Sequence, residues 1–578
     1  MRAALRLRLR VIAALIMVVA FLLIARLYFV QIVDGEEYSL RAERQYVSAS
    51  RTIYDRGSIY FTRKDGTQLS GAALGTGFLV AIDPSKLKKP DEVYATLSTH
   101  FELEEEEFDA AVAKINDPYE VLARRVPEDA GRAISDLEIP GVIIERERWR
   151  IYPAEDRAAQ TVGFVAYDND NDLAGRFGLE RYYEDVLSRS NTGLFGNFFA
   201  ELFANLDDAV GDANHARSGN LVTAIEPVVL EKLDQVLMNV QTKYGSAETG
   251  GIIMNPKTGE IIALQTVPSF DPNVFAKEDS DYFGNPLVES RYEFGSIVKA
   301  LTMASGIDAG VITANTTYND TGTITLNSKT ISNFDGKARG VVPMQEVLSQ
   351  SLNTGVSFIA GKLGHERFRG YFEKLGMGAE TGIDLPSEIP GTIDNILKSP
   401  RDVEYATASF GQGIAQTPVE MIKALGALAN DGKVVTPHIV RSIRLESGIT
   451  KDLSWGNPEE VYSPEAVEEV TRMLVNVVDH SLAGGNVAIP EMSVAAKTGT
   501  AQISAPSGGY YDDRYFHSFF GYFPAYEPKF IILLYTREPG GVRYASETLT
   551  DPFMELTSFL ISYYAIPPDR VEYAESEE

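Results

Sequence analysis

The sequence predicts a multidomain protein of mixed α and β structure that ends in an α/β domain. The chain has 578 residues, which is too many for a single hydrophobic core. An apolar content of 44% with 10% aromatic residues is typical of folded domains rather than of disorder. In the C-terminal half, strand-like runs at both ends enclose a mostly helical stretch, so sequence-distant strands are expected to form one sheet.

Composition excludes two classes of function. The formal net charge is −28, so no basic surface is available in bulk and nucleic acid is not an expected partner. The chain has no cysteine, which excludes a thiol nucleophile, a thiolate metal site and any disulfide. The six histidines are scattered and no H-E-x-x-H pattern occurs, so neither a metal site nor a cofactor is expected.

The N-terminus predicts a membrane anchor. Residues 11–33 begin with an apolar run, Val11 to Val30, as long as the roughly 20 residues that cross a bilayer. No small-residue cleavage site follows the run, so we favour a retained anchor over the alternative, a cleaved signal peptide. The basic residues of segment 1–10 predict that this end is cytoplasmic and that everything after the anchor is extracytoplasmic; they are Arg2, Arg6, Arg8 and Arg10.

Residues 34–218 are predicted to form a second region of mixed strands and helices. "GVIIERERWRIYP" is strand-like, and "FELEEEEFDAAVAKI" is typical of a solvated helix. Apolar residues from Phe195 to Leu206 fall on one face of a helix. Two interpretations stay open: the helix packs on its own domain, or this face docks on the membrane or on a partner protein.

Residues 219–567 are predicted to form the α/β domain, and 568–578 a disordered acidic tail. "VVLEKLDQVLMNVQ" reads as a helix and "GGIIMNPKTGEIIALQT" as a β-hairpin. Later, "MSVAAKTGTAQI", "HSFFGYF" and "KFIILLYT" read as successive strands. "DPFMELTSFLISYY" reads as a helix with Asp551 as its N-cap and Pro552 at its first position.

One pair of residues carries candidate chemistry. In "RYEFGSIVKALTMASG", Ser296 and Lys299 stand at the start of an apolar helical run. Residues i and i+3 share a helix face, so the Lys299 amine can reach the Ser296 hydroxyl. Desolvation would lower the lysine pKa and make the amine a base that activates the hydroxyl as a nucleophile. The alternative is a helix start with a stray lysine.

Two further motifs favour the catalytic interpretation. Ser351-Leu-Asn353 precedes a helical run, and Lys497-Thr498-Gly499-Thr500 lies in a predicted strand. Similar spacings occur elsewhere, but in polar linkers or turns: Ser85–Lys88, Ser218–Asn220 and Lys257–Gly259. Only one combination runs S-x-x-K, then S-x-N, then K-T-G in a fitting structural context, and together the three are a specific signal.

The chain resembles the class B penicillin-binding proteins, membrane-anchored peptidoglycan transpeptidases. The resemblance also rests on "RTIYDRGSIY", "GFVAYDNDNDLAGRFGLERYYEDVL", "NPKTGEIIALQTVPSFDPN" and "SFGQGIAQTPVEM". It implies an elongated pedestal domain over 34–218. It also implies a transpeptidase domain over 219–567, with a five-stranded antiparallel sheet flanked by helices and an all-helical subdomain.

The resemblance implies a role for each motif residue. Ser296 attacks the penultimate D-alanine carbonyl of a stem peptide, Lys299 takes its proton, and Ser351 relays a proton to the leaving amine. Asn353 positions Lys299 and the substrate amide. Thr498 and Thr500 hold the substrate carboxylate, Lys497 supplies positive charge beside it, and Gly499 lets the substrate approach the strand. Backbone N–H groups of Ser296 and Thr500 form the oxyanion hole.

The resemblance also implies partners and leaves alternatives open. The expected ligands are stem peptides and β-lactams, and the expected partners are a membrane glycosyltransferase and other cell-wall assembly proteins. "SLNTG" resembles the division branch more than the elongation branch. The alternatives are a serine β-lactamase or β-lactam sensor, and a non-catalytic scaffold. Phe294 stands where the family usually has proline, and the Phe195–Leu206 segment looks like an insertion.

Overall fold

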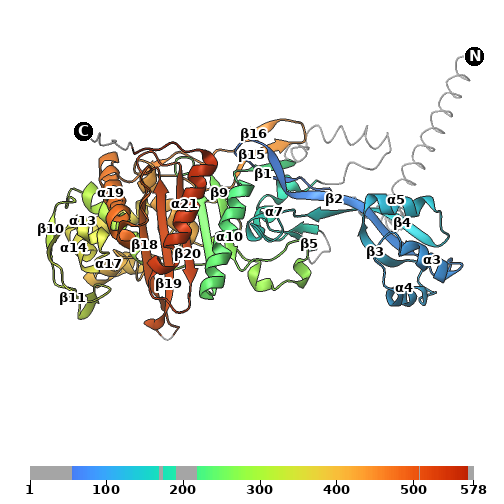
Figure 1. Cartoon of the computed structure of the whole chain (residues 1–578), viewed down its shortest axis with the longest axis horizontal. Coiled ribbons are helices and arrows are strands. Elements are labelled where there is room, and N and C mark those ends of the chain that lie inside the picture. The colour runs from blue at the N-terminus through green and yellow to red at the C-terminus, as the bar shows by residue number, and fades with distance from the viewer. Residues whose placement is uncertain (1–54, 168–172, 190–217, 507, 571–578) are drawn as a thin grey trace, which may run out of the picture. The chain divides into compact units, whose positions relative to one another are not determined.

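The structure, a computed structural model, describes residues 55–167, 173–189, 218–506 and 508–570 (Figure 1). The predicted anchor at 11–33 and the segment from Phe195 to Leu206 lie outside these ranges. Within the described ranges, no helix is both long and apolar enough to cross a membrane.

The chain divides into two compact units. One includes Gly75–Trp149, and the other comprises Arg56–Leu74 and Arg150–Glu578. The region predicted as a pedestal, 34–218, is therefore shared between the two units. The described part of residues 219–567 lies wholly in the second unit.

The unit with Gly75–Trp149 is a small sheet covered by short helices. The second part of β2 (Gln68–Ile82) pairs with β3 (Glu120–Val126) and with β4 (Val142–Ile151), which confirms the predicted strand "GVIIERERWRIYP". The helices are α3 (Pro90–Leu97), α4 (Glu105–Val112) and α5 (Glu128–Asp136). The acidic run forms α4 as predicted, but Phe108 on this helix is buried in the core of the unit, so only one face is solvated.

In the second unit, a buried ion cluster holds the segment that follows the predicted anchor. Arg56 donates through Nε to Glu180 at 2.6 Å, and Arg150 donates to the other carboxylate oxygen of Glu180, also at 2.6 Å. Glu180 lies on α7 (Gly178–Tyr182) and is fully buried. Nearby, β1 (Ile59–Thr62), β7 (Gly219–Thr223), β15 (Val440–Leu445) and β16 (Thr450–Asp452) form a sheet in the order β16-β15-β7-β1.

A five-stranded antiparallel sheet forms the centre of the second unit (Figure 1). Its order is β18 (Ala495–Ser504), β19 (Tyr510–Phe523), β20 (Phe530–Arg537), β8 (Glu248–Met254) and β9 (Ile261–Val267). The predicted hairpin is β8–β9, and it joins strands from the far end of the chain because β20 pairs with β8. β18 is the edge strand, so one side of its backbone is free of strand partners in this sheet.

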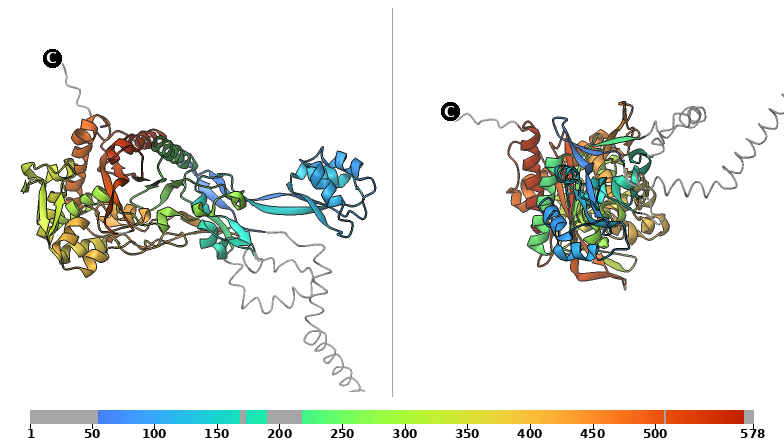
Figure 2. Two further views of the ribbon diagram at one scale, coloured as in Figure 1. Left: turned by 90° about the horizontal axis from the view of Figure 1, so that it is seen from below. Right: turned by 90° about the vertical axis from the view of Figure 1, so that its right-hand side faces the viewer.

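Two helices cover one face of this sheet. Figures 1 and 2 show α10 (Pro227–Tyr244) and α21 (Thr550–Tyr564) side by side along it. The predicted N-cap of α21 is wrong: the helix begins at Thr550 with Leu549 as its cap, and Asp551 lies inside its first turn. The short helix α20 (Ala545–Thr548) ends one residue before the cap, Leu549. Helical backbone therefore resumes at Thr550, ahead of the predicted first position. Pro552 is tolerated because N–H groups of the first turn lack helical partners.

The region between Ser296 and Gly485 is mostly helical, as predicted, but it is not the all-helical subdomain that the resemblance implied. Strand pairs interrupt it, among them β10 (Thr317–Asp320) with β13 (Gly340–Pro343), and β11 (Thr323–Leu326) with β12 (Lys329–Ser332). For the β11–β12 pair, the physical reason is the threonine-rich run "TITLNSKTIS". Asn327 and Ser328 in this run take positive φ values of 48° and 63°. Two positive φ values in a two-residue loop favour a tight hairpin.

The helices of this region and the remaining short elements complete the second unit. The helices are α11 (Pro286–Glu289), α12 (Val298–Asp308), α13 (Met344–Ser349), α14 (Asn353–Leu363), α15 (His365–Lys374), α16 (Asp394–Lys398), α17 (Asp402–Ala408), α18 (Pro418–Gly426) and α19 (Pro464–Asn476). The short elements are α6 (Ala159–Val162), α8 (Glu184–Leu187), β5 (Val165–Tyr167), β6 (Leu173–Gly175), β14 (Lys433–Val434) and β17 (Glu459–Glu460).

The start of the acidic tail is ordered, which corrects part of the predicted disorder of 568–578. Arg570 forms an ion pair with Asp479 at 2.8 Å, and Asp569 accepts a hydrogen bond from the Ser493 backbone N–H at 2.6 Å. Residues 571–578 lie outside the described ranges.

Candidate active site

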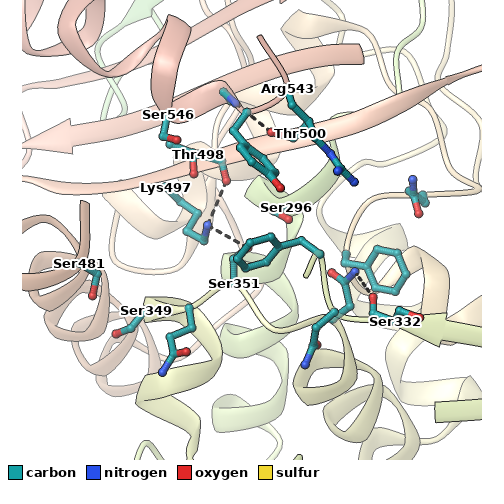
Figure 3. A pocket seen from close by; sticks show the side chains of 18 of the residues that line it. Ser296, Ser332, Ser349, Ser351, Ser481, Lys497, Thr498, Thr500, Arg543 and Ser546 are labelled. Carbon is teal, nitrogen blue, oxygen red and sulfur yellow. Dashed lines mark hydrogen bonds between the residues drawn. The ribbon is translucent and has the colours of Figure 1, made fainter. Parts of the chain in front are cut away.

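The three motifs meet in one cleft of the second unit. The cleft has a volume of about 840 Å³ and lies between the edge strand β18 and the region of α12 to α14 (Figure 3). The motif residues that line it are Ser296, Ser351, Asn353, Lys497, Thr498 and Thr500. Lys299 lies directly behind, fully buried, and Gly499 lies in β18 between the two threonines. The structure thus brings together every predicted site residue.

A close contact between backbones sets the position of the nucleophile. Gly295–Ile297 form one 3₁₀ turn that leads into α12. Gly295 has φ of +63°, and a Cβ there would lie 2.7 Å from the Thr500 carbonyl oxygen. Glycine therefore meets both a conformational and a steric requirement at this turn. The contact places the Ser296 and Thr500 backbones next to one another, which supports the predicted oxyanion hole without testing it.

Phe294 holds the other side of this turn. Its ring is fully buried, with its centroid 5.3 Å from that of Phe516 in an edge-to-face arrangement. Its carbonyl oxygen accepts a hydrogen bond of 2.7 Å from the Ser518 hydroxyl on β19. The departure from the usual proline therefore places a large core side chain under the nucleophile and leaves the turn tied to the sheet.

Lys299 is a buried amine bonded to Ser351. Its Nζ donates to the Ser351 carbonyl oxygen at 2.6 Å and to Ser351 Oγ at 3.1 Å. Burial, and then the positive charge of Lys497, hold the pKa of Lys299 well below its ordinary value of 10.5. Contrary to the direct contact that the i, i+3 spacing allowed, Lys299 Nζ makes no hydrogen bond to Ser296 Oγ in the described structure. A neutral amine that donates both N–H groups to Ser351 keeps its lone pair for the Ser296 proton.

Ser351 Oγ links the two lysines. Besides the bond from Lys299, it accepts one of 3.2 Å from Lys497 Nζ, which also donates to the Thr498 carbonyl oxygen at 3.0 Å. Burial lowers the pKa of Lys497 to about 8. Ser351 has a φ of +54°, a left-handed conformation that is strained for a residue other than glycine. The bond from Lys299 to its carbonyl group helps to hold this conformation.

Asn353 differs from its implied role. Its side-chain amide donates to the Ser332 carbonyl oxygen at 2.8 Å, and among the described contacts it has none with Lys299. The β12 end of the hairpin therefore positions Asn353. The base is positioned by Ser351, the first residue of the same motif.

A buried network behind Asn353 was missed by the sequence analysis. Asp320 accepts from the Thr354 hydroxyl at 2.7 Å, from Asn333 Nδ2 at 3.0 Å and from the Arg339 backbone N–H at 3.0 Å. Asp320 is 1% exposed. Burial raises the pKa of Asp320, but these hydrogen bonds outweigh it and leave the pKa lowered. The network ties Thr354, the neighbour of Asn353, to the β10 and β12 strands.

We expect Asp320→Asn to lower both stability and the rate of acylation. An amide nitrogen would face donors in place of an acceptor, and leaving buried donors unsatisfied costs about 1–3 kcal/mol of unfolding free energy. Displacement of Asn353 is expected to slow acylation by a penicillin about tenfold. Urea unfolding and stopped-flow labelling measure the two effects.

Asp394→Asn is the matched control, since Asp394 pairs with Lys398 on the exposed α16. An Asp320→Asn protein with a normal acylation rate would show that the network is structural only.

The strand residues differ in what they contribute. A Cβ at Gly499 would lie 2.3 Å from Ser518 Oγ and 2.5 Å from the Phe294 carbonyl oxygen, so glycine is required for packing against the nucleophile turn. The predicted approach of substrate to this part of the strand stays a prediction. Thr500 Oγ1 accepts from the Ala545 backbone N–H at 3.0 Å, which leaves its own hydrogen free to donate to a substrate carboxylate.

Two aromatic side chains meet at the rim of the cleft and were also missed. Phe334, from the loop after β12, and Tyr544, from the loop before α20, lie edge to face with ring centroids 5.8 Å apart. Both line the cleft. His517 on β19 is a buried structural histidine. Its ring nitrogens contact Thr548 Oγ1 at 2.9 Å and the Arg543 carbonyl oxygen at 3.0 Å, and burial lowers its pKa to about 4.

Comparisons with known proteins agree with this geometry. Residues 249–556 match the family described as penicillin binding protein transpeptidase domain, and residues 55–193 match the penicillin-binding protein dimerisation domain. The chain is 26% identical to Stage V sporulation protein D of Bacillus subtilis, over 93% of this chain and 82% of that protein. It is 25% identical to the peptidoglycan D,D-transpeptidase FtsI of Buchnera aphidicola, over 97% and 96% of the two chains.

Solved structures show the same relation. Penicillin binding protein 3 from Mycobacterium tuberculosis in its apo form superposes with a TM-score of 0.65 at 25% identity, over 73% of this chain and 92% of that one. Its complex with aztreonam superposes equally well, with a TM-score of 0.65 over 74% of this chain. A family match over more than half of the chain, on a fold with all three motifs in one cleft, shows that the chain belongs to the penicillin-binding protein transpeptidase family.

Proposed function

We propose that the chain is a serine-type peptidoglycan D,D-transpeptidase, which cross-links stem peptides through an acyl-enzyme on Ser296 and is a target of β-lactams. One observation carries the proposal: a hydroxyl, a buried amine with a lowered pKa and an edge strand converge on one cleft. The names of relatives support it, among them the peptidoglycan D,D-transpeptidases FtsI and MrdA.

In the acylation step, Ser296 Oγ attacks the carbonyl carbon of the penultimate D-alanine and its proton passes to Lys299 Nζ. The developing oxyanion is stabilised by the backbone N–H groups of Ser296 and Thr500. The bond from that carbon to the nitrogen of the terminal D-alanine then breaks. Ser351 donates its hydroxyl proton to the leaving nitrogen, and Lys299 returns the proton to Ser351 along the hydrogen bond that joins them.

In the second step, the amine of a neighbouring stem peptide attacks the ester carbon. Its proton leaves through the same Ser351–Lys299 pair and returns to Ser296 Oγ as the ester bond breaks. None of the described residues that line the cleft is acidic. A serine β-lactamase of the common type uses a carboxylate to activate water. The described lining of this cleft contains no such carboxylate. This favours aminolysis over hydrolysis.

The proposal includes a location and partners. We place the chain in the cytoplasmic membrane through a single anchor at 11–33, with the N-terminus inside and the catalytic domain outside. The basic residues before the apolar run support this orientation. A transpeptidase without its own polymerising domain needs a source of glycan strands, so a membrane glycosyltransferase and other assembly proteins are the proposed partners. The relatives named FtsI support the division branch.

Intact-mass analysis after incubation with benzylpenicillin tests the proposal. We expect a stoichiometric, long-lived adduct that peptide mapping places on Ser296 and that Ser296→Ala abolishes. Failure of the folded protein to form an adduct would favour the scaffold alternative. Loss of the adduct within seconds would favour the β-lactamase alternative.

A further inference from the structure

The charge of the cleft is opposite to that of the chain. The whole protein carries 81 acidic and 53 basic residues. The residues that line the cleft include three basic side chains, Arg339, Lys497 and Arg543, and no acidic one. A cleft with one sign of charge in an oppositely charged protein concentrates ligands that carry the complementary charge. Negative charge on the substrate is therefore favoured in this cleft.

Two of the three cations already have partners. The guanidinium of Arg339 pairs with both carboxylate oxygens of Asp335, at 2.7 and 2.9 Å, and donates to Gln350 at 3.0 Å. Lys497 is bonded to Ser351 and Thr498 and is assigned above to the terminal carboxylate of the substrate. Neither cation is free to receive a second anionic group.

Arg543 is different. Its side chain is exposed, and within the described residues it forms no ion pair and donates no hydrogen bond. The acidic residue four positions along, Glu547, instead accepts from the Tyr544 backbone N–H at 3.1 Å. The Arg543 guanidinium carbon lies 5.5 Å from the centre of the Tyr544 ring, which limits where the side chain can point.

The backbone around Arg543 is fixed against the catalytic strand. The Arg543 carbonyl group is bonded to His517, which pairs with Thr500 across the β18–β19 ladder. Two residues on, the Ala545 N–H donates to Thr500 Oγ1. Figure 3 shows the Arg543 side chain beside Thr500, extending toward the region of Ser296. A guanidinium on such a support is preorganised to receive a carboxylate.

We propose that Arg543 is a specificity-determining residue that selects donor peptides with a second free carboxylate, upstream of the scissile bond. The inference rests on the proposed transpeptidase function and names its substrate class: an acyl donor with two anionic groups, the terminal carboxylate and a side-chain carboxylate that has not been amidated. Lys497 and the threonines of β18 bind the first group, and Arg543 binds the second through paired N–H donors.

Two thioester donors that end in D-alanyl thioglycolate test the proposal. They differ only in whether the preceding residue carries a side-chain carboxylate or the matching carboxamide. We expect the wild-type protein to be acylated three- to tenfold faster by the carboxylate donor, because one partly exposed ion pair contributes a free energy of that size. Arg543→Gln should lower that ratio to about one and leave the rate with the carboxamide donor unchanged. Arg543→Lys should restore part of the preference, and added salt should weaken it.

Two controls separate this inference from the proposed function. Arg472→Gln removes an exposed arginine from α19, outside the cleft, and should keep the wild-type ratio. Benzylpenicillin, whose side chain is neutral, should acylate wild type and Arg543→Gln at rates within twofold. If benzylpenicillin forms no adduct, the proposed function fails.

If benzylpenicillin reacts but Arg543→Gln keeps the wild-type preference, or the wild type has none, the role of Arg543 is overturned. Benzylpenicillin and its α-carboxy derivative provide the same comparison without requiring the thioesters to react.

Discussion

Lys299→Met is expected to slow acylation of Ser296 by benzylpenicillin at least about a thousandfold while the protein stays folded. General-base catalysis by a positioned side chain contributes on the order of 10²–10⁴-fold. Methionine fills a similar volume but has no lone pair that can take the Ser296 proton. It also removes both bonds to Ser351, whose left-handed conformation depends on them in part. Time-resolved labelling with a fluorescent penicillin measures the rate.

The stability of this variant is a second part of the prediction. Removing a fully buried amine relieves a desolvation cost, whereas the Ser351 carbonyl group loses a donor. These two terms oppose each other, so the unfolding free energy is expected to change by less than about 2 kcal/mol. Lys362→Met, on the exposed side of α14, is the matched control and should change neither rate nor stability. A folded Lys299→Met protein that labels at the wild-type rate would mean that another group takes the proton.

The second large effect is a fall in the acylation rate above about pH 8. Burial lowers the pKa of Lys497 to about 8, and burial together with the charge of Lys497 holds the pKa of Lys299 well below its ordinary value of 10.5. Below pH 8, Lys497 is charged and attracts the substrate carboxylate, while the lowered pKa of Lys299 favours the neutral amine that can accept a proton. Above pH 8, Lys497 loses its charge and the rate should fall about tenfold per pH unit. Because both amines share Ser351 Oγ, the observed midpoint belongs to the pair.

The pH dependence of the unfolding free energy distinguishes this fall in acylation rate from unfolding of the protein. The pKa of Lys497 is lower in the folded protein than its ordinary value of 10.5, so between pH 8 and 10.5 the unfolded chain binds more protons at this residue. Its contribution to the unfolding free energy therefore rises with pH while the rate falls. Acylation rates and thermal midpoints measured at the same pH values test this. Acylation of Lys497→Met should be slow at pH 7, and its rate should not fall further at alkaline pH. If the rate of this variant falls with the same midpoint, a group other than Lys497 causes the fall.

Much of the local structure could be predicted from the sequence because local rules decide it. The apolar period of "VVLEKLDQVLMNVQ" and the capping box at Thr417 and Glu420 required no distant contact to be read, and both elements form as expected. The hairpin from Lys329 to Ser332 with its partner strand was missed although its Asn-Ser turn is a local signal. The start of α21 was misplaced because α20, directly before it, alters the path of the chain.

For the site too, some features could be predicted from local sequence and others depend on distant contacts. The three motifs together predicted the nucleophile, the amine and the strand motif, because i and i+3 share a helix face and the motif residue types are specific in combination. Spacing could not identify the partner of Lys299, which is Ser351 rather than Ser296, or the reason for Gly499, which is the Phe294 carbonyl group. Both depend on contacts between segments remote in sequence.

By itself, then, the sequence determined the candidate groups, namely a hydroxyl, an amine and a strand, and the family resemblance of its motifs implied the anionic, acyl-bearing class of ligand. Only the tertiary structure decided the pKa, the conformation and the contacts of each group. Burial lowers the pKa of both lysines, a left-handed Ser351 links them, Asp320 supports Asn353, and Arg543 at the rim of the cleft has no ion pair among the described residues. The physical reason is that desolvation and hydrogen-bond geometry depend on which side chains surround a group in space, and a one-dimensional pattern does not specify these neighbours.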